Sequence, residues 1–159
     1  MKLLRNILLS CVFVLVGALS TSCGKAFKDK VRLNSWDVVY TTVTGPRSAE
    51  AGIRLGVENG AASFKVKDVK GDVRRGEKTI GHFTVDPGTV KVPGHKASDC
   101  EFAVRFELEE GVSMVRMMSM IATGSTDDFT FDLGCTVKYH GISRKIKYKD
   151  QPLGKYIGL

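Results

Sequence analysis

The sequence predicts an all-β domain, an immunoglobulin- or fibronectin-III-like β-sandwich of seven to eight strands with one short helix at about residues 109–122. Three observations lead to this prediction. From residue 31 onward, apolar and polar residues alternate in short runs, and glycine or proline bounds most of these runs. Only one segment has helical periodicity instead. Many short strands separated by turn residues are typical of an antiparallel sandwich.

The first strand is expected at residues 31–44, where it ends before Gly45. Its alternation places four side chains on one face: Trp36, Val38, Tyr40 and Thr42. Further strands are expected at 53–58, 64–73, 79–85, 90–92, 100–108, 129–139 and 142–148. In the strand at 64–73 the parity of the apolar residues changes between Lys67 and Asp68, which predicts a β-bulge there.

The helix is expected because methionine and isoleucine recur at helical spacing between the two strongest strands. Met114, Met117, Met118 and Ile121 share one helical face. A methionine stripe can form an adaptable binding surface. At this spacing we expect it instead to pack on the core and cover one end of the sandwich.

The amino-terminal segment differs in kind from the rest and is expected to be an export signal, at residues 1–22. Lys2 and Arg5 precede an apolar run at 7–19, and small residues follow. A membrane-spanning helix needs about 20 apolar residues, so a retained anchor is the weaker interpretation. Residues 23–30 would then form a tether, and residues 31–159 the folded domain.

The stretch Leu19-Ser20-Thr21-Ser22-Cys23 resembles the lipobox of bacterial lipoproteins, in the serine-rich form of the Bacteroides group. The family pattern prefers leucine three residues before the cysteine, where this chain has Ser20. The resemblance implies that Cys23 carries acyl chains such as palmitate and anchors the protein in the outer membrane, facing the periplasm. The alternative is a soluble secreted protein whose Cys23 is free or disulfide-bonded.

The order of the expected elements over residues 31–148 resembles the late embryogenesis abundant type 2 family, the water stress and hypersensitive response domain. The matching stretches are 52–59, which leads into a turn at Asn59, the corner at 90–94, and the strand at 102–108. The chain departs from the family turn, because Gly60 and Ala61 follow Asn59. The resemblance implies a non-enzymatic sandwich that protects against stress or binds lipid or protein surfaces.

We find no motif that indicates catalysis, a metal site or a cofactor. His82, His95 and His140 lack the close spacing of metal ligands. The serines lack the context of an activated nucleophile, and no glycine-rich segment has the lysine of a phosphate loop. The protein is therefore not expected to be an enzyme.

Cys100 and Cys135 both fall on the inward face of their strands. If those two strands paired around the intervening helix, the thiols would lie close enough for a disulfide, and export would supply an oxidising compartment. The alternative is two buried thiols that act as small apolar groups.

The carboxyl-terminal strands are rich in basic residues, and the chain as a whole is basic. The net charge is +7, and loss of Lys2 and Arg5 with the signal would leave 22 bases against 17 acids, or +5. Five residues are candidates for contact with an anionic surface: Lys138, Arg144, Lys145, Lys147 and Lys149. A merely solvated strand face is the alternative, and export disfavours nucleic acid as the partner.

Two functions from different classes are compatible with these features. The first is a lipid-anchored, non-enzymatic envelope protein that binds a membrane or protein partner or protects against stress. The second is a structural accessory subunit of an envelope or adhesion assembly, which offers an edge strand to its partner.

Overall fold

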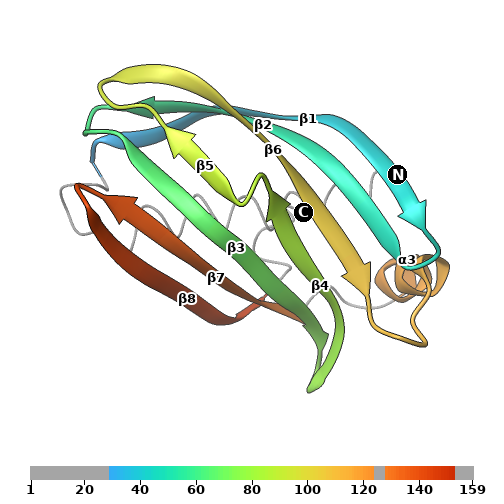
Figure 1. The fold of residues 1–159 in the computed structure, drawn as a ribbon. Coiled ribbons are helices and arrows are strands. Elements are labelled where there is room, and N and C mark those ends of the chain that lie inside the picture. Colours follow the sequence, from blue (N-terminus) through green and yellow to red (C-terminus); the bar gives the residue numbers. More distant parts are fainter. Residues whose placement is uncertain (1–28, 124–127, 153–159) are drawn as a thin grey trace.

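The computed structural model describes residues 29–123 and 128–152, and most of them lie in antiparallel β-strands (Figure 1). The predicted all-β class is confirmed. The elements in chain order are β1 (Val31–Gly45), β2 (Ser48–Asn59), β3 (Phe64–Arg75), β4 (Lys78–Asp86), β5 (Thr89–Val92), β6 (Lys96–Leu108), α3 (Met114–Thr123), β7 (Phe129–Tyr139) and β8 (Ile142–Pro152).

The strands form one sheet of eight, in the order β1-β2-β6-β4-β3-β7-β8, with β5 also paired to β3. The strands β4 and β5 follow each other along β3: β4 pairs with residues 70–75 and β5 with residues 64–67. The cis peptide bond between Asp86 and Pro87 lies between β4 and β5. Because β4 pairs with both β6 and β3, it connects a half made of β1, β2 and β6 to a half made of β3, β7 and β8.

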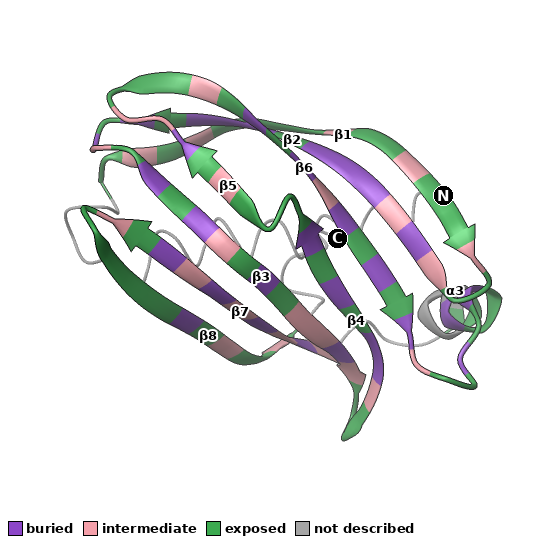
Figure 2. Ribbon diagram, in the orientation of Figure 1, coloured by how far each residue is buried: buried purple, intermediate pink, exposed green. Residues whose placement is uncertain are grey.

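The two halves share a single hydrophobic core, as a β-sandwich requires. Along β3, β6 and β7 buried side chains alternate with exposed or half-buried ones (Figure 2). The largest fully buried side chains come from both halves and include Phe64, Phe83, Phe106, Phe129 and Phe131. All buried core residues that the structure describes lie between Ala49 and Ile146. A chain that begins at residue 24 therefore keeps every core residue that the structure describes.

The prediction that one face of β1 carries Trp36, Val38, Tyr40 and Thr42 is wrong. Trp36 and Val38 do face inward, opposite Leu55 and Ile53 of β2. A register shift between Val38 and Tyr40 then inserts one extra residue and turns Tyr40 outward. The Tyr40 ring lies over Gly52, where any Cβ would meet ring carbons at 2.2 Å, and its hydroxyl donates to Glu50 Oε1 at 2.6 Å.

The bulge predicted between Lys67 and Asp68 is confirmed. The register of β3 with β7 shifts between Lys67 and Lys70, and Asp68 adopts a positive φ of 53°. A positive φ is uncommon outside glycine, but aspartate tolerates it better than most residues. The extra residue brings Val69 and Val73 to the core face.

The predicted helix is confirmed, but it begins at Met114 because residues 109–112 form a turn. The amide of Val112 donates to the Glu109 carbonyl at 3.1 Å, and Gly111 has a φ of 81°. Met114 and Met117 are buried in the core, which confirms that this face covers one end of the sandwich. The side chains of Met118 and Ile121 lie outside the described residues.

The expected export signal at residues 1–22, Cys23 and most of the tether also lie outside the described residues. In the part of the chain that the structure describes, no helix has the length and apolarity to cross a bilayer.

Candidate functional site

Three lysines from three neighbouring strands lie side by side on the outer face of the sheet. Lys65 of β3 is in register with Lys91 of β5 on one side and with Lys138 of β7 on the other. Directly opposite residues in a sheet have Cβ atoms about 4.5–5.5 Å apart, and like charges at this spacing are destabilising. Repulsion among these three ammonium groups therefore destabilises the fold locally.

The next two rows along the same strands carry more lysines. Lys67 aligns through Thr136 with Lys145 of β8, and Lys70 aligns through Gly134 with Lys147. These side chains are exposed, apart from the half-buried Lys67. We define this surface as the lysine face, which comprises Lys65, Lys67, Lys70, Lys91, Lys138, Lys145 and Lys147.

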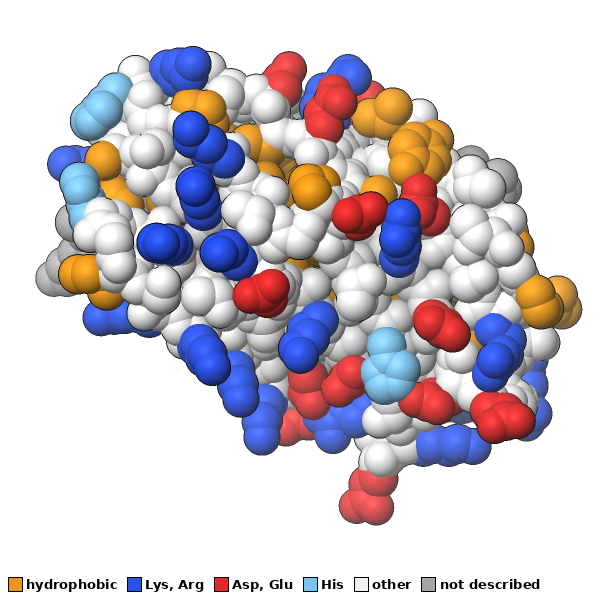
Figure 3. Space-filling view, viewed as in Figure 1, with side chains coloured by type: hydrophobic (Ala, Val, Ile, Leu, Met, Phe, Trp, Pro, Cys, Tyr) orange, Lys and Arg blue, Asp and Glu red, His pale blue; other side chains and the backbone are white. Residues whose placement is uncertain are grey.

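Within residues 29–123 and 128–152, the lysines of this face form no ion pairs, although Asp68, Asp72 and Asp132 lie near some of them. The ion pairs that the structure describes on the sheet involve arginine or His82 instead. Arg54 contacts Glu101 at 2.6 Å, Arg74 contacts Asp132 at 3.0 Å, and Arg105 contacts Glu50 at 2.8 Å. Basic side chains predominate over β3, β5 and β8 in the space-filling view (Figure 3).

A hollow of about 590 Å³ lies within the lysine face. Lys70, Lys145 and Lys147 line it, together with the hydroxyl-bearing Thr136 and the carboxylate-bearing Asp68. Gly134 lies between Lys70 and Lys147 in the register and has no side chain to fill the space. Ammonium and hydroxyl groups around a shallow hollow can hold a phosphate-sized anion.

The structure unites only part of the basic set predicted from the sequence. Lys138, Lys145 and Lys147 belong to the lysine face, and Lys149 lies at its boundary, next to Asp150. Arg144 does not belong to it, because its register partner is the buried Val137, which places Arg144 on the inner side of β8.

The prediction missed the lysines of β3 and β5, namely Lys65, Lys67, Lys70 and Lys91. Their alternation with valines does predict an outward face. What the sequence did not supply was the pairing of β3 with both β5 and β7, which adds these lysines to those of β7 and β8.

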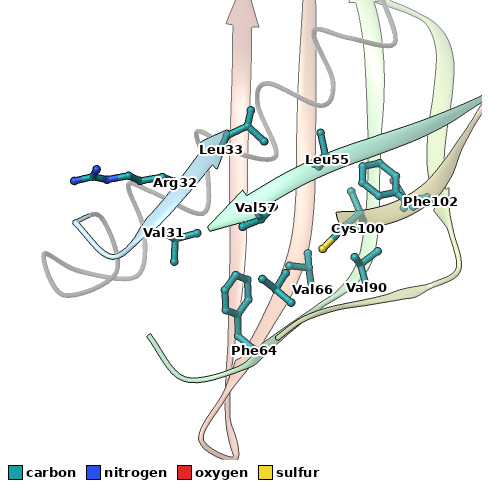
Figure 4. Close-up of a pocket in the computed structure, with 13 residues that line it drawn as sticks. Val31, Arg32, Leu33, Leu55, Val57, Phe64, Val66, Val90, Cys100 and Phe102 are labelled. Atoms are coloured by element: carbon teal, nitrogen blue, oxygen red, sulfur yellow. The ribbon is translucent and has the colours of Figure 1, made fainter. Parts of the chain in front are cut away.

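An apolar cavity of about 80 Å³ lies on the inner side of the same end of the sandwich (Figure 4). Its lining side chains come from the β-strands β1 to β6 and include Leu55, Val57, Phe64 and Phe102. The half-buried Val31 and Leu33 contribute from β1. Arg32 also borders the cavity, but its guanidinium points away from the other labelled side chains in Figure 4.

Asn59 fixes the loops at this end. It is fully buried, and its Nδ2 donates to the Ala62 carbonyl at 3.2 Å and to the Pro93 carbonyl at 3.0 Å. Its Oδ1 accepts from the Ala61 amide at 2.9 Å. One side chain thus holds the turn after β2 against the corner between β5 and β6. The turn at Asn59 was predicted, but its bond to the distant corner was not.

Cys100 and Cys135 are both buried, and no disulfide joins them. The condition for a disulfide is not met, because β6 pairs with β2 and β4 whereas β7 pairs with β3 and β8. Cys100 lines the apolar cavity, and its thiol donates to the Lys91 carbonyl at 3.8 Å. Burial raises the pKa of the Cys100 thiol.

His82 of β4 lies between two carboxylates on the same outer face of the sheet as the lysine face, beside its Lys70 end. Its Nδ1 is 2.6 Å from Asp72 Oδ1, and its Nε2 contacts Glu109. The hydrogen bond to Asp72, followed by that to Glu109, raises the pKa of His82, although partial burial opposes this shift.

Replacement of His82 by glutamine should destabilise the fold at low pH more than at high pH. A folded-state pKa above the unfolded value of about 6.5 gives stability that is complete below that value and lost as the pH rises through the folded pKa. Half of the side chain is exposed, so screening limits the effect to about 1 kcal/mol. Thermal unfolding at pH 5.5 and 8.5 measures it, and an equal loss at both pH values would contradict the assignment.

The described residues contain no group of three or more His, Cys, Asp or Glu side chains placed to hold a metal ion.

No family model matches this chain, and no curated protein is similar to it. A crystal structure of a protein from Archaeoglobus fulgidus is similar in fold, at 14% sequence identity and a TM-score of 0.46. The alignment covers 76% of this chain and 98% of that one. An identity this low says nothing about function, and the resemblance to the late embryogenesis abundant type 2 family stays a prediction.

Proposed function

We propose that this protein is a lipid-anchored, non-enzymatic protein of the cell envelope that holds its lysine face against an anionic, phosphate-bearing surface. The observation that carries the proposal is the row formed by Lys91, Lys65 and Lys138, in register on three strands. Such a row weakens the fold unless a partner supplies negative charge. Phosphate groups of anionic lipids supply that charge at the surface to which the acyl chains would tether the domain.

The position of the tether supports this proposal. The Lys30 carbonyl accepts a hydrogen bond from the Gly60 amide at 2.7 Å, which fixes the start of β1 beside the turn that leads into β3. Cys23 precedes Val31 by eight residues, a reach of at most about 28 Å when fully extended. The acyl group and the lysine face therefore act at the same end of the domain, and an acyl chain combined with a basic patch anchors better than either alone.

The intact mass of the protein purified from membranes tests directly whether Cys23 is acylated. We expect a chain that begins at Cys23 and carries acyl groups, and we expect the Cys23→Ala variant to lack them. A soluble product without added mass would contradict the anchor and leave only the electrostatic part of the proposal.

The edge strand β1 favours a second candidate, an accessory subunit of an envelope or adhesion assembly. In the described part of the chain β1 pairs with β2 alone. It also exposes Val39 at 50% and Val43 at 55%, whereas β8, the other edge, carries lysines that discourage strand addition. A partner strand could therefore add to β1 more readily than to β8.

Charges placed on β1 test this second candidate. Val39→Lys combined with Val43→Lys should abolish a partner complex of fixed stoichiometry and change the stability of the fold by only about 0.5 kcal/mol. The control is Val115→Lys on α3, where the native side chain is 78% exposed. Complexes can be measured by crosslinking and light scattering, and equal yields from both variants would argue against a role for β1.

A further inference from the structure

The apolar cavity is a second site, separate from the lysine face. Inner side chains of β3 and β5, such as Phe64, Val66 and Val90, line it, while Lys65 and Lys91 project from the opposite side of the same strands. An anion held by the lysine face therefore cannot also fill the cavity.

The lining selects the chemistry of a ligand. Apart from Arg32, whose guanidinium points away, the lining consists of aliphatic and aromatic side chains and the Cys100 thiol (Figure 4). The thiol already donates to the Lys91 carbonyl. A polar group would find no hydrogen-bond partner among these side chains, so its burial would be unfavourable. The site therefore favours a purely apolar group.

The size of the cavity sets the length of that group. A cavity of about 150 Å³ holds the six carbons of benzene. In the same proportion, a volume of 80 Å³ holds a hydrocarbon segment of about three carbons. The half-buried Val31, Leu33 and Val90 form a rim through which such a segment could enter.

We propose that this cavity binds the end of a single saturated hydrocarbon chain and leaves the head group of that chain outside. The chain can come from two sources, a free membrane lipid or the acyl group on Cys23. The second source is within reach because only seven residues lie between Cys23 and Val31 at the rim. This second source depends on the anchor proposed above, whereas the site itself does not.

The test uses the rate at which a small thiol reagent modifies Cys100, with Cys135 as an internal control. Cys135 is buried in the same core but does not line the cavity. The probes are n-alkyl glucosides from methyl to octyl, below their micelle concentrations, added to the unacylated chain 24–159. Their neutral head group does not engage the lysine face, so the result is independent of the function proposed above.

We expect bound glucoside to slow modification of Cys100 and not of Cys135. Each methylene that enters the cavity should lower the Kd about fourfold, up to about three carbons, beyond which longer chains should gain little. Equal slowing of both thiols would reflect general stabilisation or nonspecific binding. That result, or a Kd that does not depend on chain length, would overturn the proposal.

A rim variant provides an independent check. Val90→Trp should raise the Kd for octyl glucoside at least tenfold, because the indole would fill the entrance. Val38→Trp is the matched control, since Val38 is also half-buried against the core but does not line the cavity. If Val90→Trp fails to fold, the dependence of the Kd on alkyl chain length still tests whether the cavity binds a hydrocarbon chain.

To distinguish the two sources of the hydrocarbon chain, the rate of Cys100 modification is compared between acylated and unacylated protein in neutral phosphatidylcholine vesicles. If modification is slow only in the acylated protein, the Cys23 acyl group is the occupant. Slow modification in both the acylated and the unacylated protein identifies a free lipid. Either result supports the site, and rapid modification in both proteins would contradict it.

Discussion

Replacement of Lys65, Lys91 and Lys138 together by glutamine should weaken binding to anionic vesicles about 100-fold and leave the fold as stable as before or more stable. Each basic side chain near an anionic membrane contributes about 1 kcal/mol, so three of them contribute about 3 kcal/mol. The stability should not fall, because the three ammonium groups repel one another across neighbouring strands. Vesicle cosedimentation and thermal unfolding measure the two effects.

The matched control removes three charges from elsewhere. Arg47, Lys78 and Arg116 are exposed and lie at the other end of the domain, outside the lysine face. Their replacement by glutamine gives the same net charge as the first triple variant. Because it leaves the lysine face intact, it should reduce binding far less. Similar losses in both triple variants would show that net charge alone drives binding, and the row of lysines would then have no special role.

The Asn59→Ala substitution should lower the free energy of unfolding by about 3 kcal/mol and the Tm by about 10 °C. It removes three hydrogen bonds from a fully buried side chain, each worth about 1 kcal/mol net. It also leaves the buried amide of Ala61 without its acceptor. For a domain of this size, 1 kcal/mol corresponds to roughly 3 °C. Urea and thermal unfolding provide the measurement.

Asn34 is the matched control, because it is exposed on β1. Its replacement by alanine should change the stability by less than about 0.5 kcal/mol. A similarly small effect at Asn59 would mean that the turn after β2 and the corner at Pro93 are held together by other contacts.

The elements of this fold could be predicted because burial leaves a local signature. Strands with one buried face alternate in period two, and β6 and β7 show this most clearly. The bulge at Asp68 was predictable for the same reason, since one extra residue shifts the parity of all that follow. In β1 the pattern failed, because much of that edge strand is exposed and its apolar side chains do not mark a single face.

The candidate sites depend on which strands become neighbours, and alternation carries no information about that. The pairing of β3 with β5 and β7 brings the lysines into one row. The separation of β6 from β7 removed the expected disulfide partner of Cys100. The cavity likewise needs side chains from the β-strands β1 to β6. A search for clusters along the sequence therefore found only the basic residues of β7 and β8.

The central claim is that the lysine face binds an anionic surface, and the most direct test omits the acyl anchor. Cosedimentation of the unacylated chain 24–159 should be compared on vesicles of phosphatidylcholine alone and vesicles that also contain phosphatidylglycerol, at low and at physiological salt. We predict binding only to the anionic vesicles, with an affinity that falls as salt screens the charges. Equal binding to both vesicle types, or no binding to either at low salt, would contradict the account.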